Sequence, residues 1–188
     1  MKIHKLNRYL ELEEIPQMVE IFLAKGEEKE LAKGEYFLRE GQKCDYIGYV
    51  QRGGFRHLKE ASDGTERIAG YSFEGDFVTN FTSGEGEGSA ISLQAMRDST
   101  VYLLSKKEIY SHQTWEYRFK VAQVSLADVY GRLLLMHVGT AEERYLNLIA
   151  YFPAILNEVP LKEIASFLRM TPETLSRIRK KILSNENS

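Results

Sequence analysis

The sequence predicts an α+β fold in which short antiparallel strands come first, a long helix follows and a small all-helical region ends the chain. Two observations carry this prediction. Between about residues 30 and 105, short apolar runs alternate with glycine-containing breaks, which is typical of an antiparallel sandwich or barrel. After residue 111, apolar residues recur every three or four positions, as they do on the faces of helices.

The bulk composition is that of a soluble globular protein. A chain of 188 residues, 43% hydrophobic and 28% charged, can form one large or two small domains. No apolar run approaches the length of a membrane span, and the N-terminus lacks the apolar core of a signal peptide, so we expect a cytoplasmic protein with no membrane partner. Cys44 is the only cysteine, which excludes an intrachain disulfide and a cysteine-ligated iron–sulfur or zinc site.

The first half of the chain predicts one helix and then strands. Residues 8–25 have helical spacing, with Pro16 expected to split the helix in two. Asp63-Gly64 is a strong hairpin signal, because both residue types tolerate positive φ. The apolar runs that we expect to be strands are YIGYV, RIAGYSF, AISLQA and VYLL, at 46–50, 67–73, 90–95 and 101–104.

A long helix is predicted between Ser111 and Val138. Its apolar residues step alternately by four and three over about three heptads, which is near the minimum for a coiled coil. The seam could pack on the helix's own domain, but its regularity favours the interface of a homodimer. The seam residues are Trp115, Phe119, Ala122, Leu126, Val129, Leu133 and Met136.

Three shorter helices are predicted at the C-terminal end. The first, over 139–152, begins with a capping box formed by Thr140 and Glu143 and ends at Pro153. The helices 161–170 and 170–182 then have the pattern of a helix-turn-helix, with a small residue, Ala165, where they cross. The core of this motif is expected to consist of Ile164, Leu168, Leu175 and Ile178, and Thr171 and Pro172 are expected to start the second helix.

The polar face of the last helix predicts contacts with DNA. Arg can pair with guanine and Glu can accept from cytosine, and Glu173 and Arg177 lie one turn apart. The alternative is that they form only an i,i+4 pair on a solvated surface. Residues 161–188 contain six basic and three acidic residues, a local charge of +3 that leaves −5 for the rest of the chain. The predicted DNA-binding residues are Thr171, Glu173, Ser176, Arg177 and Lys180.

On these motifs the chain resembles the Crp/Fnr family of transcriptional regulators. The resemblance rests on KGEYFLREGQ (33–42), DGTERIAGYSFEGDFV (63–78) and VPLKEIASFLRMTPETLSRIRKKI (159–182). It implies a cyclic-nucleotide-binding-like β-roll over 1–110, a dimerisation helix over 111–138 and a helix-turn-helix domain over 139–188. It also implies a pseudo-palindromic DNA site, RNA polymerase as a partner, and base-contacting roles for Glu173 and Arg177.

Two segments depart from the family pattern. The phosphate-binding cassette of the family has Gly-Glu and Arg-Ser where this chain has Thr79-Asn80 and Gly88-Ser89, and no Lys or Arg occurs between Arg67 and Arg97. We therefore predict no cyclic nucleotide binding through the cassette, although these four residues remain a candidate pocket for an unknown effector. Residues after Ile182 are too few for the DNA-contacting wing that many members have. The turn residue Arg169 stands where Gly is usual, which costs about 1 kcal/mol if φ is positive.

Three functions remain in competition at this point. The first is a homodimeric DNA-binding regulator, and the second is an effector-binding or protein-interaction module that has lost DNA reading. An enzyme is the weakest, because the sequence has no nucleophile elbow, P-loop or metal-spaced histidine cluster, and we predict no metal or cofactor. His57, His112 and His137 are haem ligand candidates only in the sense that any histidine is.

Overall fold

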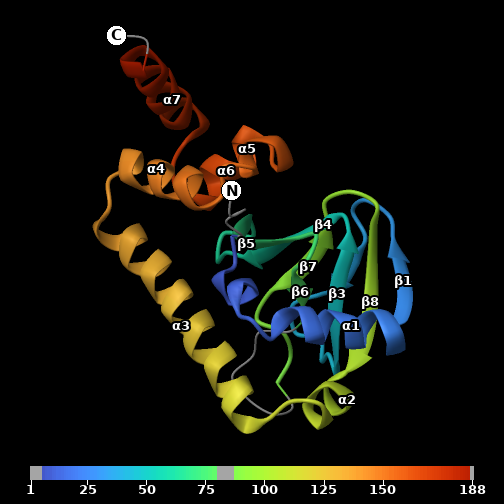
Figure 1. The fold of residues 1–188 in the computed structure, drawn as a ribbon. Coiled ribbons are helices and arrows are strands. Elements are labelled where there is room, and N and C mark those ends of the chain that lie inside the picture. The colour runs from blue at the N-terminus through green and yellow to red at the C-terminus, as the bar shows by residue number, and fades with distance from the viewer. Residues whose placement is uncertain (1–5, 80–86, 187–188) are drawn as a thin grey trace. The chain divides into compact units, whose positions relative to one another are not determined.

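The computed structural model describes residues 6–79 and 87–186 and divides into two compact units (Figure 1). The larger unit spans Asn7–Val124 and the smaller one is built from Ser125 onward, so the boundary falls inside one long helix. In the described residues one α-helix precedes the strands and the other α-helices follow them, which confirms the predicted α+β class.

The larger unit is a pair of antiparallel four-stranded sheets. The strand order is β1-β8-β3-β6 in one sheet and β2-β7-β4-β5 in the other. The strands are β1 (Glu27–Leu31), β2 (Tyr36–Leu38), β3 (Tyr46–Arg52), β4 (Gly54–Glu60), β5 (Glu66–Phe73), β6 (Phe77–Val78), β7 (Ser92–Ala95) and β8 (Ser99–Ser105).

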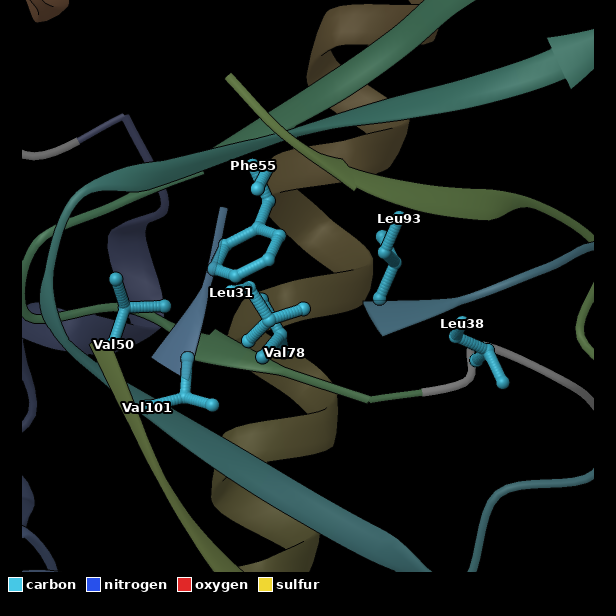
Figure 2. Packing of buried hydrophobic residues seen from close by; sticks show 8 residues of the cluster. Leu31, Leu38, Val50, Phe55, Val78, Leu93 and Val101 are labelled. Carbon is cyan, nitrogen blue, oxygen red and sulfur yellow. The ribbon is translucent and has the colours of Figure 1, made fainter. Parts of the chain in front are cut away.

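The core of this unit lies between the two sheets. Figure 2 shows Phe55 and Leu93 from one sheet, and Val50, Val78 and Val101 from the other, around a shared interior. All five side chains are 0% exposed. Because side chains alternate between the two faces of a strand, one face of each sheet is turned inward.

The predicted hairpin at Asp63-Gly64 joins β4 and β5. Only Gly64 takes a positive φ, of 75°, and its amide donates to the carbonyl of Ala61 at 2.9 Å. Asp63 keeps a negative φ and instead accepts from the amide of Thr65 at 3.0 Å. The connection is therefore a longer loop than the two-residue turn typical of this sequence signal.

Helical segments cover the outer face of the first sheet. A short 3-10 turn, Arg8–Glu11, precedes helix α1 (Ile15–Lys25), and helix α2 (Lys106–Ser111) follows β8. The predicted split occurs, but before Pro16 rather than at it, because Pro16 occupies the first turn of α1, where its missing N–H has no partner to lose. Phe22 of α1 packs with Phe77 and Leu104 of the sheet and Ile109 of α2.

The smaller unit is all helical in its described part. Helix α3 (Trp115–Val138) begins four residues later than the predicted Ser111, because α2 ends there and Thr114 accepts the first-turn amide of Tyr117 at 3.2 Å. The remaining helices are α4 (Ala141–Tyr151), α5 (Ile155–Glu158), α6 (Leu161–Phe167) and α7 (Pro172–Glu186). None of the described helices is both long enough and apolar enough to cross a membrane.

Candidate nucleic-acid interface

Helices α6 and α7 pack around a small apolar core. Ala165 is 0% exposed, and Ile164, Leu168, Leu175 and Ile178 are at most 7% exposed. This confirms the core that the sequence predicted for the helix-turn-helix. A larger side chain at Ala165 would have to displace these neighbours, because protein interiors are close-packed.

The turn between the two helices is a Schellman motif centred on Arg169. The amide of Met170 donates to the carbonyl of Ala165 at 3.0 Å, and the amide of Arg169 donates to that of Ser166 at 3.1 Å. Arg169 has a φ of 55°, the only positive φ among the described non-glycine residues. Arg169 therefore does occupy a turn position whose φ favours Gly, as expected from the sequence. The backbone adopts the left-handed conformation despite the side chain.

Arg144 of α4 holds this turn, and nothing in the sequence predicted that role. Its guanidinium donates to the carbonyl of Leu168 at 3.0 Å, to that of Arg169 at 3.4 Å and to that of Gly139 at 2.9 Å. Two of these acceptors are the carbonyls left unpaired where α6 ends. Because the acceptors lie up to 25 residues away, only the folded chain brings them to Arg144.

Helix α7 begins as the sequence predicted. The hydroxyl of Thr171 accepts from the amide of Thr174 at 3.2 Å, and Pro172 is the first residue of the helix. The cap therefore fixes the residue at which α7 starts.

The exposed face of α7 carries Glu173, Ser176, Arg177 and Lys180. No ion pair of the described residues joins Glu173 to Arg177, so the alternative of a mutual pair is not seen. The amide of Glu173 itself, and then the hydroxyl of Thr171, hold the pKa of the Glu173 carboxyl below its ordinary value. The face therefore presents one ionised acceptor beside two cations, which is a pattern suited to base edges and phosphates.

Lys181 lies on the flank of α7 and has a different environment. Its ammonium pairs with the carboxylate of Glu142 in α4 at 2.7 Å. This ion pair turns one of the local basic residues toward the domain itself, so the charge of the C-terminal region is not all available to a polyanion.

The predicted seam on α3 is exposed to solvent. Leu126 is 70% exposed, Trp115 67%, and the other seam residues are exposed except for the half-buried Met136. Soluble proteins rarely leave a row of large apolar side chains on one helix uncovered. The seam therefore has the exposure that a partner helix requires, while its role as the dimer interface stays a prediction.

The residues of the candidate effector pocket are largely committed to the fold. Ser89 is 2% exposed, and its hydroxyl donates to the carbonyl of Ile91 at 2.7 Å. Thr79 donates to the carbonyl of Tyr46 at 3.1 Å. A Cβ on Gly88 would overlap the carbonyl of Gly41, so the arginine of the family cassette has no room there. Asn80 lies outside the described residues.

Three parts of the chain together define the class of protein to which it is compared. It has an antiparallel β-domain, one long helix and a helix-turn-helix, and the model of the family named "Cyclic nucleotide-binding domain" matches residues 28–112. Among the described residues, no group of histidine, cysteine and carboxylate side chains is placed to hold a metal ion.

Comparison with known proteins shows what the chain is similar to. The chain is 26% identical over 172 residues to the transcriptional activator protein Anr of Pseudomonas protegens, covering 83% of this chain and 70% of that protein. It has the fold of FixK2 from Bradyrhizobium japonicum, with a TM-score of 0.70, 21% identity and 86% of each chain covered. The global regulator CLP of Xanthomonas campestris aligns with a TM-score of 0.63 and 16% identity, over 91% of this chain and 93% of that one. The chain is thus similar in sequence to a transcriptional activator and similar in fold to FixK2 and CLP.

Proposed function

We propose that this chain is a DNA-binding transcription regulator that acts in the cytoplasm as a homodimer. The observation that carries the proposal is α7, one face of which is buried against α6 while the other presents Glu173, Ser176, Arg177 and Lys180 to solvent. A capped helix with a fixed orientation and an unburied polar face is what major-groove recognition requires. The transcriptional activator Anr, a relative along most of the chain, supports the same function.

Each exposed residue of α7 has a role in the proposed complex. Arg177 donates two hydrogen bonds to O6 and N7 of a guanine, and Glu173 accepts from N4 of a cytosine. Ser176 faces the neighbouring base edge, and Lys180 contacts a phosphate of the backbone. Thr171 uses its hydroxyl to cap α7, so its contribution to DNA binding is to fix the helix start.

Dimerisation through the α3 seam supplies the second half-site. Pairing two seams buries large apolar side chains such as Trp115 and Leu126 and places two copies of α7 on one duplex. The operator is then a pseudo-palindrome whose half-sites lie about one helical turn apart. RNA polymerase is the partner expected of a regulator that acts at promoters.

Selection from a random duplex library tests this function directly. The purified protein should enrich a pseudo-palindromic sequence, and the enrichment should fall steeply as salt is raised, because phosphate contacts release counterions. Failure to enrich any sequence would favour the second function, an effector-binding or protein-interaction module that no longer reads DNA.

We further propose that the regulator does not bind a cyclic nucleotide through its cassette. The hydroxyl of Ser89 is turned to Ile91, and Gly88 leaves no space for a phosphate-binding arginine. Calorimetry with cyclic AMP and cyclic GMP should therefore give no sub-micromolar binding. A tight binding isotherm with either nucleotide would contradict this part of the proposal, and any effector is expected to bind elsewhere.

A further inference from the structure

A hollow of about 380 Å³ lies along the second half of α7. Its described lining residues all belong to this helix and recur at the three- and four-residue spacing of one helix face. They are Ser176, Arg179, Lys180, Leu183 and Ser184. The helix continues to Glu186, four residues beyond the predicted end at Ile182, so the whole hollow is carried by regular helix.

The hollow lies on one flank of α7, beside the face proposed to read bases. Residues two positions apart lie about 200° apart around a helix axis, so Arg179 and Lys181 occupy opposite flanks. The exposed face with Glu173 and Arg177 lies between them. A helix in the major groove has base edges before its exposed face and a sugar–phosphate backbone along each flank.

The two flanks differ in how their positive charge is used. Lys181 is paired with the carboxylate of Glu142 at 2.7 Å. In contrast, Arg179 and Lys180 make no side-chain ion pair or hydrogen bond within the described part of the chain, and no described carboxylate lines the hollow. The charge of the Arg179 flank is therefore available to an external anion.

The other lining groups indicate which anion fits. Leu183 is 57% exposed beside the two cations. An exposed apolar side chain gives nothing to a free hydrated phosphate, but it can pack on the carbons of a deoxyribose that adjoins a phosphate. The Ser184 hydroxyl donates to the carbonyl of Lys180 at 2.8 Å, so the contact with the anion falls to the two cations.

We propose that this flank of α7 binds the sugar–phosphate backbone of DNA, with Arg179 and Lys180 on a phosphate and Leu183 on the adjoining deoxyribose. Arg179 and Leu183 thereby join Lys180, whose phosphate contact belongs to the proposed function on which this inference rests. Because the hollow contacts no base, it adds affinity for every sequence and leaves the choice of base pair to Arg177.

The test is the salt dependence of DNA binding, measured by fluorescence anisotropy on the selected duplex and on an unselected duplex of equal length. Arg179→Gln should reduce the slope of log affinity against log salt by about 0.9 for each bound subunit on both duplexes, because a phosphate contact releases counterions. Arg179→Lys keeps the charge and should keep the slope. Lys181→Gln removes the same charge from the opposite flank and should leave the slope unchanged.

Two outcomes would overturn the proposal. An unchanged slope in Arg179→Gln would remove Arg179 from the backbone contact. An equal reduction in Lys181→Gln would mean that net charge, and not this flank, sets the slope. Thermal melting checks that each variant is folded.

Leu183→Gln tests the deoxyribose contact separately. It should weaken binding to both duplexes by about threefold at an unchanged slope, because an apolar contact is lost and no counterion is involved. An unchanged affinity would contradict the contact with the sugar.

The unselected duplex separates this inference from the proposed function. A chain that enriches no sequence, but shows the Arg179→Gln slope change on the unselected duplex, would contradict base reading and support the backbone contact. Enrichment of a sequence together with an unchanged slope in Arg179→Gln would do the reverse. Absence of binding to either duplex would overturn both.

Discussion

Arg169 shows how a single residue can be kept against its own conformational preference. Its φ of 55° costs about 1 kcal/mol for a residue other than glycine. The two Schellman hydrogen bonds and the Arg144 guanidinium hold the backbone there in spite of that cost. The turn of the helix-turn-helix is therefore set by its surroundings and not by the residue that occupies it.

Replacing Arg169 by Gly should stabilise the protein by up to about 1 kcal/mol, because glycine adopts a positive φ without strain. Urea unfolding followed by helical circular dichroism measures the change. Arg179→Gly, inside α7, is the control and should destabilise by a similar amount. A destabilised Arg169→Gly would mean that the Arg169 side chain contributes more than the strain costs.

Tyr117 should make stability depend on pH in the alkaline range. Burial, followed by the charge of Glu14, raises the pKa of its phenol to about 12, from about 10 in the unfolded chain. Between these values the folded chain holds the proton and the unfolded chain has lost it. Stability from the neutral phenol is therefore fully present below about pH 10 and is lost as pH rises through about 12.

Tyr117→Phe should reduce this loss. The free energy of unfolding of the variant should fall less between about pH 9 and about pH 11 than that of the unchanged chain. Equal losses in both would show that the phenol is not held neutral by the fold. Subtracting the two curves removes the contribution of the other tyrosines, several of which also have a raised pKa.

For single residues, roles that depend on neighbours within one helical turn were predictable from the sequence. Roles that depend on residues far away in the chain were not. Thr140 with Glu143, and Thr171 with Pro172, act within one helical turn, and the structure confirms both starts. The role of Arg144 could not be predicted, because it donates to the carbonyl of Leu168 at the end of another helix, α6. Ser89 matched the family cassette in sequence, but only the fold shows that its hydroxyl is used internally.

At the scale of elements, helices whose apolar residues are regularly spaced were predictable from the sequence. Elements with few apolar residues were not. The helices α4, α6 and α7 follow their apolar periodicity, whereas β1 was missed because four of its five residues are exposed. Its only neighbour in the sheet is β8, so it is an edge strand, and charge on an edge protects against aggregation. The short α5 was also missed, since four residues give no period.

Arg144→Ala tests how α4 supports the helix-turn-helix. The variant loses hydrogen bonds from a charged group to the carbonyls of Leu168, Arg169 and Gly139, and we expect a destabilisation of about 1.5–3 kcal/mol. Urea unfolding measures it, with Lys162→Ala, an exposed cation of α6, as the control that should change little. A variant as stable as the control would remove Arg144 from this role.

At the scale of the whole molecule, the exposed seam of α3 is the surface through which we propose that two chains pair. Leu126→Glu should convert the proposed dimer to a monomer without unfolding it, because the side chain is 70% exposed in the isolated chain. Sedimentation velocity measures the change. Ala127→Glu, an exposed neighbour outside the seam, should remain dimeric. A dimer that survives Leu126→Glu would place the interface on another surface.

The central claim is that the exposed face of α7 reads base pairs, and Arg177→Ala tests it most directly. The matched control is Lys181→Ala, which removes the same charge from the same helix but from the flank that pairs with Glu142. Affinities are measured by fluorescence anisotropy for the selected duplex and for each single base-pair change in it. We predict that Arg177→Ala loses about 1–3 kcal/mol on the selected duplex and no longer discriminates at one base pair in each half-site, while Lys181→Ala keeps the full discrimination profile. An unchanged profile in Arg177→Ala would contradict the account.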